Sequence, residues 1–245
     1  MSEGHWRARR DQLALKAIDR STLSYLGNGP LFGSRNWLHD PQHWRTFVKN
    51  HAHGIVACDF LVAVTVRFQV LFVFIVMEIG SRRILHYKVT AHPTADWTRQ
   101  QFREAIPSDH SYQFLIHDRD SIFSAELDEE IKSSFGVRVL RTPVRAPTAN
   151  AYCERLVGTV RRECLDFIIP LNERHLRRTL RPWVAHYNKG RPHSSLGPGI
   201  PERSSASPLT RPQNRGHRLP RDCEIRAKDI LGGLHHEYWL EQGAA

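Results

Sequence analysis

The order of apolar and polar positions changes abruptly at Gly54, and from there to about residue 190 it predicts strands and helices. Residues 55–66 are rich in Val, Ala and Phe, residues 68–79 form a second apolar stretch, and residues 82–90 alternate more regularly. Runs of β-branched and aromatic residues separated by turn residues such as Gly80 are typical of strands. This part of the chain therefore predicts three strands joined by tight turns.

Helical and strand patterns then alternate along the chain. Helical periodicity is found at 94–105, 124–135, 150–167 and 172–188, and short strands are predicted at 112–117 and 137–141. Thr94 is a suitable N-cap for the first of these helices, and Gly136 is a suitable residue to end the second. The order β-β-β-α-β-α-β-α-α predicts an α/β protein with a five-stranded mixed sheet flanked by helices, which is the order of the ribonuclease H-like fold.

The flanking segments are less regular. Residues 1–43 are poorly patterned, with one helix predicted at 8–26, and a short helix is predicted at 44–49. Beyond Gly197, Pro and Arg are frequent and the periodicity is lost, so an irregular tail is expected, with short strands near residues 223–227. The expected organisation is an N-terminal segment (1–43), a core (44–200) and a basic Pro/Arg-rich tail (201–245).

The charge favours a polyanionic partner. The formal net charge is +10, and 29 of the 35 basic residues are Arg, whose planar fork suits phosphate. Residues 161–226 hold 14 Arg and Lys against 6 Asp and Glu, so +8 of the charge lies there. A basic surface of this kind is expected of a protein that binds nucleic acid, although a merely soluble basic surface remains an alternative.

Other composition features exclude several classes of protein. No two of the four Cys have CxxC spacing, which argues against a zinc finger, and a chain this long with so few Cys does not depend on disulfides. The longest apolar run, residues 70–77, is far shorter than a membrane span, and the charged start has no signal-peptide core. We therefore expect a cytoplasmic protein without a membrane partner.

Three carboxylates stand at positions that suggest chemistry. Asp59 lies within an apolar strand, Asp118 follows another strand, and Glu154 lies in the first turn of a long helix, with 35 residues between the last two. A buried, unpaired carboxylate costs several kcal/mol, so a partner for Asp59 is expected. Oxygen ligands suit hard cations, and two Mg²⁺ or Mn²⁺ ions about 3.5–4 Å apart would support an in-line phosphoryl displacement. Taken singly, each acid also has an ordinary explanation, in a turn or at a helix start.

Several segments resemble insertion-sequence transposases with a retroviral-integrase-type DDE catalytic core. These are ACDF at 57–60, HDRDSIF at 117–123, APTANAYCERLVGTVRREC at 146–164 and HYNKGRPHSSLG at 186–197, with weaker similarity in LGGLHHEYWL near the end. The resemblance covers about residues 44–200. It implies that Asp59, Asp118 and Glu154 form the catalytic, metal-binding triad, with two Mg²⁺ or Mn²⁺ ions as cofactors.

The resemblance also suggests which side chains contact DNA. The candidates are Asn150, Tyr152, Arg155, Arg161, Arg162 and Arg191. Arg161 lies seven residues after Glu154, so the two share a helix face. For the motif around Tyr187 to His193 we favour a structural role that fixes the helix end against the core. His117 and Asp120 are expected to be loop residues, with a supporting role beside Asp118 as the alternative. Cys58 is expected to be a core residue on the opposite face of its strand from Asp59.

The predicted function is DNA transposition by hydrolysis of a phosphodiester at an element end, followed by strand transfer into double-stranded target DNA. Assembly on paired ends implies a homo-oligomer. Members of this group usually carry a helix-turn-helix region before the core, and residues 1–43 resemble none, which suggests a truncated copy. Two alternatives stay open: a nuclease of the same fold that does not join DNA, and an inactive relic core that only binds DNA or oligomerises.

Overall fold

The structure is a computed structural model that describes residues 41–142, 150–197, 199–202 and 223–242. The helix expected at 8–26 lies outside the described residues. The chain divides into two compact units after Phe47, and the architecture described here is that of the second unit, Val48–Ala245. The short helix predicted at 44–49 is present as α2 (Pro41–His51) and leads through a 3₁₀ turn, η3 (Ala52–Gly54), into the sheet.

The sheet has five strands in the order β3-β2-β1-β4-β5. They are β1 (Ile55–Val64), β2 (Val70–Glu78), β3 (Ile84–Thr90), β4 (Phe114–His117) and β5 (Arg138–Arg141). The first three form an antiparallel meander, whereas β4 runs parallel to both β1 and β5. The predicted mixed sheet is therefore confirmed, and β1 is its central strand.

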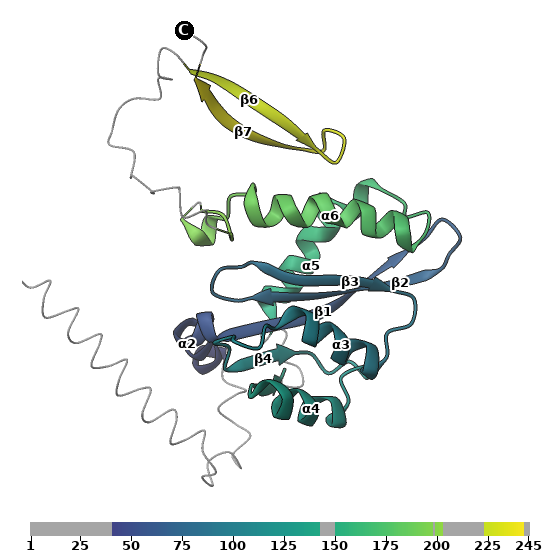
Figure 1. Cartoon of the computed structure of the whole chain (residues 1–245), viewed down its shortest axis with the longest axis vertical. Helices are drawn as coiled ribbons and strands as arrows, with labels where there is room; N and C mark the ends of the chain where they lie inside the picture. Colours follow the sequence, from purple (N-terminus) through teal and green to yellow (C-terminus); the bar gives the residue numbers. More distant parts are fainter. Residues whose placement is uncertain (1–40, 143–149, 198, 203–222, 243–245) are drawn as a thin grey trace, which may run out of the picture. The chain divides into compact units, whose positions relative to one another are not determined.

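Helices cover both faces of the sheet (Figure 1). They are α3 (Ala95–Ala105), α4 (Ala125–Phe135), α5 (Ala151–Glu163) and α6 (Glu173–Lys189). The predicted caps are confirmed, because the side chain of Thr94 accepts a hydrogen bond from Trp97 N, and Gly136 ends α4 with a left-handed φ of 67°. Figure 1 shows α3 and α4 on one face and α5 and α6 on the other.

Alternation along the strands divides the core between these two faces. Cys58 and Phe74 pack with Phe102 of α3 and Leu127 of α4, and all four are almost fully buried. The alternate strand positions face α5 and α6, where Trp183 is completely buried. Burial of each large apolar side chain contributes about 1.5–3 kcal/mol, so both helix layers are held by substantial apolar contact. As predicted, Cys58 is a core residue on the opposite face from Asp59.

Two elements differ from their predicted extents. Helix α5 was expected to continue to residue 167, but it ends at Glu163, because Cys164 has φ −140° and ψ −63°, and a 3₁₀ turn, η4 (Leu165–Phe167), follows. The C-terminal segment is more regular than expected, since β6 (Cys223–Ile230) and β7 (His235–Gln242) form an antiparallel hairpin. Its turn uses left-handed backbone at Leu231, Gly232 and Gly233.

The hairpin attaches to the core through polar contacts. Glu237 bonds the ring of His186 on α6, and the ring of His235 lies 2.6 Å from the carbonyl oxygen of Glu163. These long-range contacts could not be inferred from local periodicity. Across the described ranges, no helix is long and apolar enough to cross a bilayer.

Candidate active site

The sheet brings Asp59 and Asp118 next to each other. In the parallel pairing of β1 with β4, Ile55 lies opposite Phe114 and Ala57 opposite Ile116. Continuing this register by two residues places Asp118 opposite Asp59, immediately after β4 ends. The meander followed by a crossover therefore delivers two carboxylates, 59 positions apart in sequence, to one point of the sheet, as the sequence predicted.

Glu154 lies in the first turn of α5, which packs across β1. The start of this helix is tied to the strand by Asn150, whose Nδ2 donates to the carbonyl oxygen of Cys58, 3.2 Å away. Asn150 is only 4% exposed, so its side chain serves this connection instead of facing solvent as a DNA contact would. Glu154 itself is exposed.

Asp118 and Glu154 both affect the pKa of Asp59. Burial and the charge of Asp118 raise the pKa of Asp59 from 3.8 to about 7, and Glu154 and Asp120 add smaller effects in the same direction. The backbone N–H of Phe60 donates to Asp59 Oδ1 at 2.8 Å and opposes the shift. The site is thus a partly buried concentration of negative charge.

The acids suit a divalent cation by their chemistry. All three are oxygen donors of the kind that hard cations prefer, and a cation would relieve the repulsion that raises the pKa of Asp59. Within the described part of the chain, however, no three His, Cys, Asp or Glu side chains are gathered closely enough to hold a metal ion. The donor set fits, whereas a closed arrangement of the three ligands is not present.

A buried network supports the backbone of Asp118, a role that the sequence analysis kept only as an alternative for His117. His117, expected in a loop, is the last residue of β4 and is completely buried. Its Nδ1 lies 2.5 Å from the carbonyl oxygen of Asp118, and its Nε2 lies 3.0 Å from Asp128 Oδ1 on α4. Phe123 stacks on the ring at 4.3 Å between centroids. His117 therefore positions Asp118 and links it to α4.

Asp128 completes this network with a cation from β5. Arg141 Nε donates to Asp128 Oδ2 at 2.5 Å. Burial opposes the charge of Asp128, but the hydrogen bonds and charges of His117 and Arg141 outweigh it and hold the pKa below its ordinary value. The signal available in the sequence was the His immediately before Asp118, but its partners lie on two elements that only the tertiary structure brings together.

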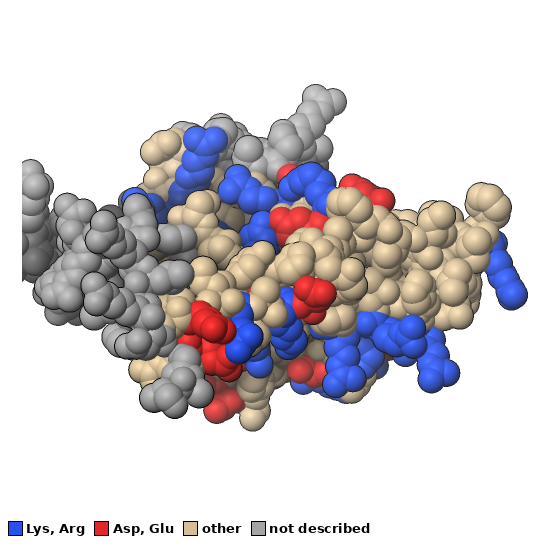
Figure 2. All heavy atoms as spheres, turned by 90° about the horizontal axis from the view of Figure 1, so that it is seen from above, with Lys and Arg blue, Asp and Glu red and all other residues tan. Residues whose placement is uncertain are grey.

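Basic side chains lie along α5 beyond Glu154. Arg161 is exposed, and its Nη2 lies 3.4 Å from the carbonyl oxygen of Val62 on β1. Arg162 folds back over Gly158, where an added Cβ would lie 2.9 Å from its Nη1. Figure 2 shows that Lys and Arg side chains on the face in view form separate groups with Asp and Glu between them. The surface in this view is therefore a mixture of charges and not one continuous basic field.

The remaining candidates for DNA contact lie on α5 and just after α6. Tyr152 lies under the guanidinium of Arg82, which is 3.8 Å from the ring centre. Arg155 is exposed, whereas Arg191 is held by two hydrogen bonds to Glu163 of 2.5 and 2.8 Å. The charge of Arg191 is thus largely matched inside the protein.

The motif at the end of α6 has the structural role that was predicted. Asn188 is buried, its Oδ1 accepts from Ile84 N and its Nδ2 donates to Ile84 O, both at 2.9 Å. This side chain therefore pairs with the edge strand β3 as a neighbouring strand would. Tyr187 is also buried and packs edge-on against His193.

Replacing Asn188 with Ala should destabilise the protein by about 2–4 kcal/mol, because two buried backbone groups of Ile84 lose their partners. Urea denaturation followed by circular dichroism measures the change. The control is Lys189→Ala, which removes only an exposed ion pair with Glu202, in which the charged atoms lie 3.9 Å apart. A loss below about 0.5 kcal/mol for Asn188→Ala would show that this pairing does not support the fold.

A comparison with protein-family models identifies part of the core. Residues 135–201 match the model described as the integrase core domain. This range includes Glu154 and the motif at residues 186–197. The match confirms the resemblance found in the sequence, on the segment where that resemblance is most specific.

A curated relative adds the context of a mobile element. A 39.2 kDa protein of insertion element IS476 from Xanthomonas euvesicatoria is 39% identical over 69 residues. The aligned part is 28% of this chain and 20% of the relative, so the chain spans a fifth of that protein.

The chain is similar in fold to chains of solved structures. The chain aligns with a chain in the structure of the simian T-cell lymphotropic virus intasome in complex with a PP2A regulatory subunit, with a TM-score of 0.53 at 13% identity, over 76% of this chain and 66% of that one. The catalytic core of HTLV-2 integrase, solved in complex with magnesium, gives a TM-score of 0.48 at 12% identity, over 61% of this chain and 94% of that one. The likeness to the intasome chain supports the predicted fold, a five-stranded mixed sheet flanked by helices.

Proposed function

We propose that this chain is the catalytic core of a DDE-type DNA transposase, which cuts and joins phosphodiester bonds of double-stranded DNA. The observation that carries the proposal is the register that places Asp118 opposite Asp59 on the central strand, with Glu154 close enough to influence the pKa of Asp59. Two carboxyl groups held this close have no role in packing, and they are best explained by a cationic ligand.

In the proposed reaction, Asp59, Asp118 and Glu154 would hold a pair of divalent cations, either Mg²⁺ or Mn²⁺. When bound, such cations activate the attacking oxygen and stabilise the leaving oxygen of a phosphoryl transfer. The protein residues supply position: β1 and β4 fix the two Asp, His117 anchors the backbone of Asp118, and α5 carries Glu154. No nucleophilic side chain is required, because water or a DNA 3′-hydroxyl attacks.

DNA is the proposed partner on the side of α5 that carries Glu154. Arg161 lies two turns beyond Glu154 on the same helix face and is exposed, so a phosphate can reach it. Because strand transfer joins two element ends to one target, we also propose that the chain acts as a homo-oligomer on DNA.

The proposal is tested by joining of DNA in vitro. Purified protein is incubated with a labelled, pre-cut element end and supercoiled target DNA, with Mn²⁺ or with a chelator. We expect joined product with Mn²⁺ and none with chelator, because the carboxylates alone supply no group that stabilises the developing charge. Inverted repeats flanking the gene identify the element end.

Two other outcomes would contradict the proposal in different ways. Cutting of an uncut end without joining of a pre-cut end would indicate a nuclease of the same fold. Binding of DNA by folded protein, with neither cutting nor joining, would indicate an inactive core. Thermal unfolding followed by circular dichroism establishes that the protein in each reaction is folded.

A further inference from the structure

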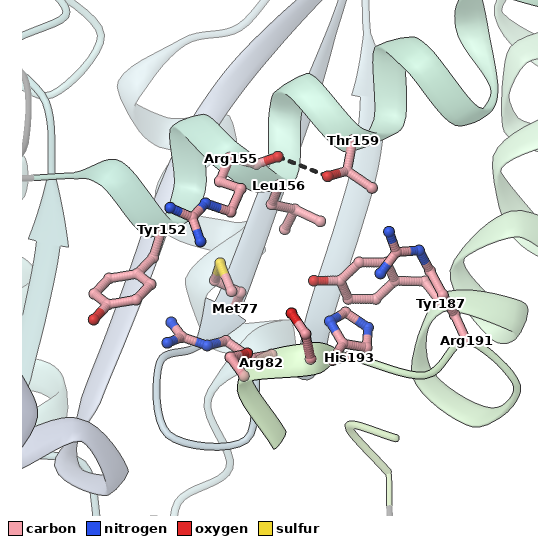
Figure 3. A pocket seen from close by; sticks show the side chains of 11 residues that line it. Met77, Arg82, Tyr152, Arg155, Leu156, Thr159, Tyr187, Arg191 and His193 are labelled. Atoms are coloured by element: carbon pink, nitrogen blue, oxygen red, sulfur yellow. Dashed lines mark hydrogen bonds between the residues drawn. The ribbon is translucent and has the colours of Figure 1, made fainter. Parts of the chain in front are cut away.

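A second polar site lies behind the helix that carries Glu154. A cavity of about 170 Å³ is enclosed by α5, the end of α6, residues 191–195 and the turn between β2 and β3 (Figure 3). Tyr152, Leu156 and Thr159 line it from one face of α5. At about 100° per residue, Glu154 lies about 200° from both Tyr152 and Leu156, so it faces away from the cavity. The cavity is therefore separate from the candidate active site.

The lining of this cavity is basic. Three Arg and no acidic residue are among its eleven lining residues. The charge of Arg191 is matched by Glu163, which leaves Arg82 and Arg155. Among the described residues, neither of these two forms an ion pair. Figure 3 shows their guanidinium groups on the same side of the cavity as Tyr152.

Two lining side chains have buried polar atoms without a hydrogen-bond partner in the described part of the chain. They are Nη1 of Arg82 and Nε2 of His193. His193 is only 9% exposed, and its ring lies beside Tyr187, across the cavity from Tyr152 (Figure 3). Buried polar atoms normally have partners, so these atoms indicate a ligand with complementary groups.

The conformation of Arg82 supports a role for its side chain. Its φ is 65°, in the left-handed region where Gly or Asn is more easily accommodated. The guanidinium nevertheless lies over the Tyr152 ring and lines the cavity. A residue that is unfavourable for the backbone at this turn is explained when its side chain serves a purpose.

We propose that this cavity binds one nucleotide unit, with its phosphate on Arg82 and Arg155 and a hydrogen-bond donor of its base or sugar facing His193. Guanidinium groups suit phosphate oxygens. Burial lowers the pKa of His193 and so favours the neutral ring. Its other ring nitrogen bonds the backbone of Tyr187, so Nε2 can accept a hydrogen bond from a donor on the ligand. Pockets that bind drug-sized ligands have volumes of about 300–1,000 Å³. This cavity is smaller, so its ligand is limited to one nucleotide unit.

The nucleotide can come from a DNA strand or from a free mononucleotide. The DNA source rests on the proposed function, in which DNA is already bound on the Glu154 side of α5, and the cavity would then hold a nucleotide of a second segment. The chemistry of recognition is the same for both sources. Binding measured in chelator separates this proposal from the proposed function, because no joining takes place under these conditions.

The test compares Arg82→Gln with a matched control, Arg103→Gln, which removes an equal charge from an exposed position on α3, on the opposite face of the sheet. Fluorescence anisotropy of a labelled duplex and thermal shift with dTMP or inorganic phosphate are measured for each. We expect Arg82→Gln to weaken binding of the duplex or of dTMP about ten-fold, with a salt dependence reduced by about one charge, and Arg103→Gln to change it less than about two-fold. Loss for the duplex alone assigns the site to a DNA strand, and loss for dTMP assigns it to a free nucleotide.

A second variant protects the test against a folding defect in Arg82→Gln. Ser195 is exposed at the cavity, so Ser195→Asp adds a negative charge there without disturbing the core. This variant should also weaken binding of the nucleotide. Equal effects of Arg82→Gln and Arg103→Gln, or unchanged binding in Ser195→Asp, would overturn the proposal. Binding of inorganic phosphate as tight as that of dTMP would overturn the assigned role of His193.

Discussion

Replacing Glu154 with Gln should reduce the rate of DNA joining at least about 100-fold and leave DNA binding within about two-fold of the wild type. Loss of one charge-stabilising group in a preorganised site typically costs a factor of 10²–10³. The fold should be unaffected, because Glu154 is exposed and the change keeps the side-chain shape. Joining is measured with a pre-cut end and Mn²⁺, and binding by anisotropy in chelator.

The chain offers a close control for this experiment. Glu126 also lies in the first turn of a helix and is exposed, but it belongs to α4 on the opposite face of the sheet. Glu126→Gln should therefore join DNA at nearly the wild-type rate. If Glu154→Gln kept more than a tenth of the wild-type rate, Glu154 would not be a member of the triad.

Replacing Asp59 with Asn should abolish joining and, at pH 8 in chelator, stabilise the protein by up to about 4 kcal/mol. The pKa of Asp59 is raised from 3.8 to about 7, chiefly by burial and by Asp118. At about 1.4 kcal/mol per pH unit, this difference corresponds to about 4 kcal/mol. Asp59 is partly exposed and its charge is screened by solvent, so a measured value of about 2–4 kcal/mol is expected.

The pH dependence has a definite sign. Below about pH 4, Asp59 is protonated in both the folded and the unfolded chain and imposes no cost. Between about pH 4 and 7 the unfolded chain releases the proton while the folded chain keeps it, so stability falls as the pH rises. Above about pH 7 the full cost is present. Urea denaturation at pH 4.5 and pH 8 should therefore show a much larger benefit of Asp59→Asn at pH 8.

A control and an added cation complete this test. Asp109→Asn, at an exposed turn position, should change the stability by less than about 0.5 kcal/mol at either pH. Mg²⁺ should stabilise the wild type more than Asp59→Asn, because only the wild type keeps all three proposed ligands. If the wild type at pH 8 were as stable as Asp59→Asn, the buried repulsion at this site would be absent.

The sequence predicted those features that depend on local pattern and chain order. Strand alternation and the caps at Thr94 and Gly136 gave the order of elements, and the order placed Asp59 near Asp118 because parallel neighbours meet at the same edge. The family resemblance favoured a catalytic role for Glu154, which local pattern alone could not distinguish from a helix-dipole residue.

The features that were missed depend on contacts between distant residues. Arg82 lies 70 positions before Tyr152, and no local signal joins them, although the stacked pair lines the second cavity. His117 was expected to be a loop residue, whereas Asp128 and Arg141 permit its burial at the end of β4. Asn150 was expected at the DNA surface, and only the packing of α5 on β1 shows its bond to Cys58.

The position of β1 at the centre of the sheet also governs when the site can assemble. Its antiparallel partner β2 is next in the chain, but its parallel partner β4 ends 53 residues after Val64. At a synthesis rate of about 5–20 residues per second, this separation corresponds to about 3–11 s. During that interval one edge of the strand carrying Asp59 is unpaired and open to other strands. In a newly made chain the carboxylate of Asp59 therefore stays in contact with water. The free-energy cost of burying it arises only when β4 docks.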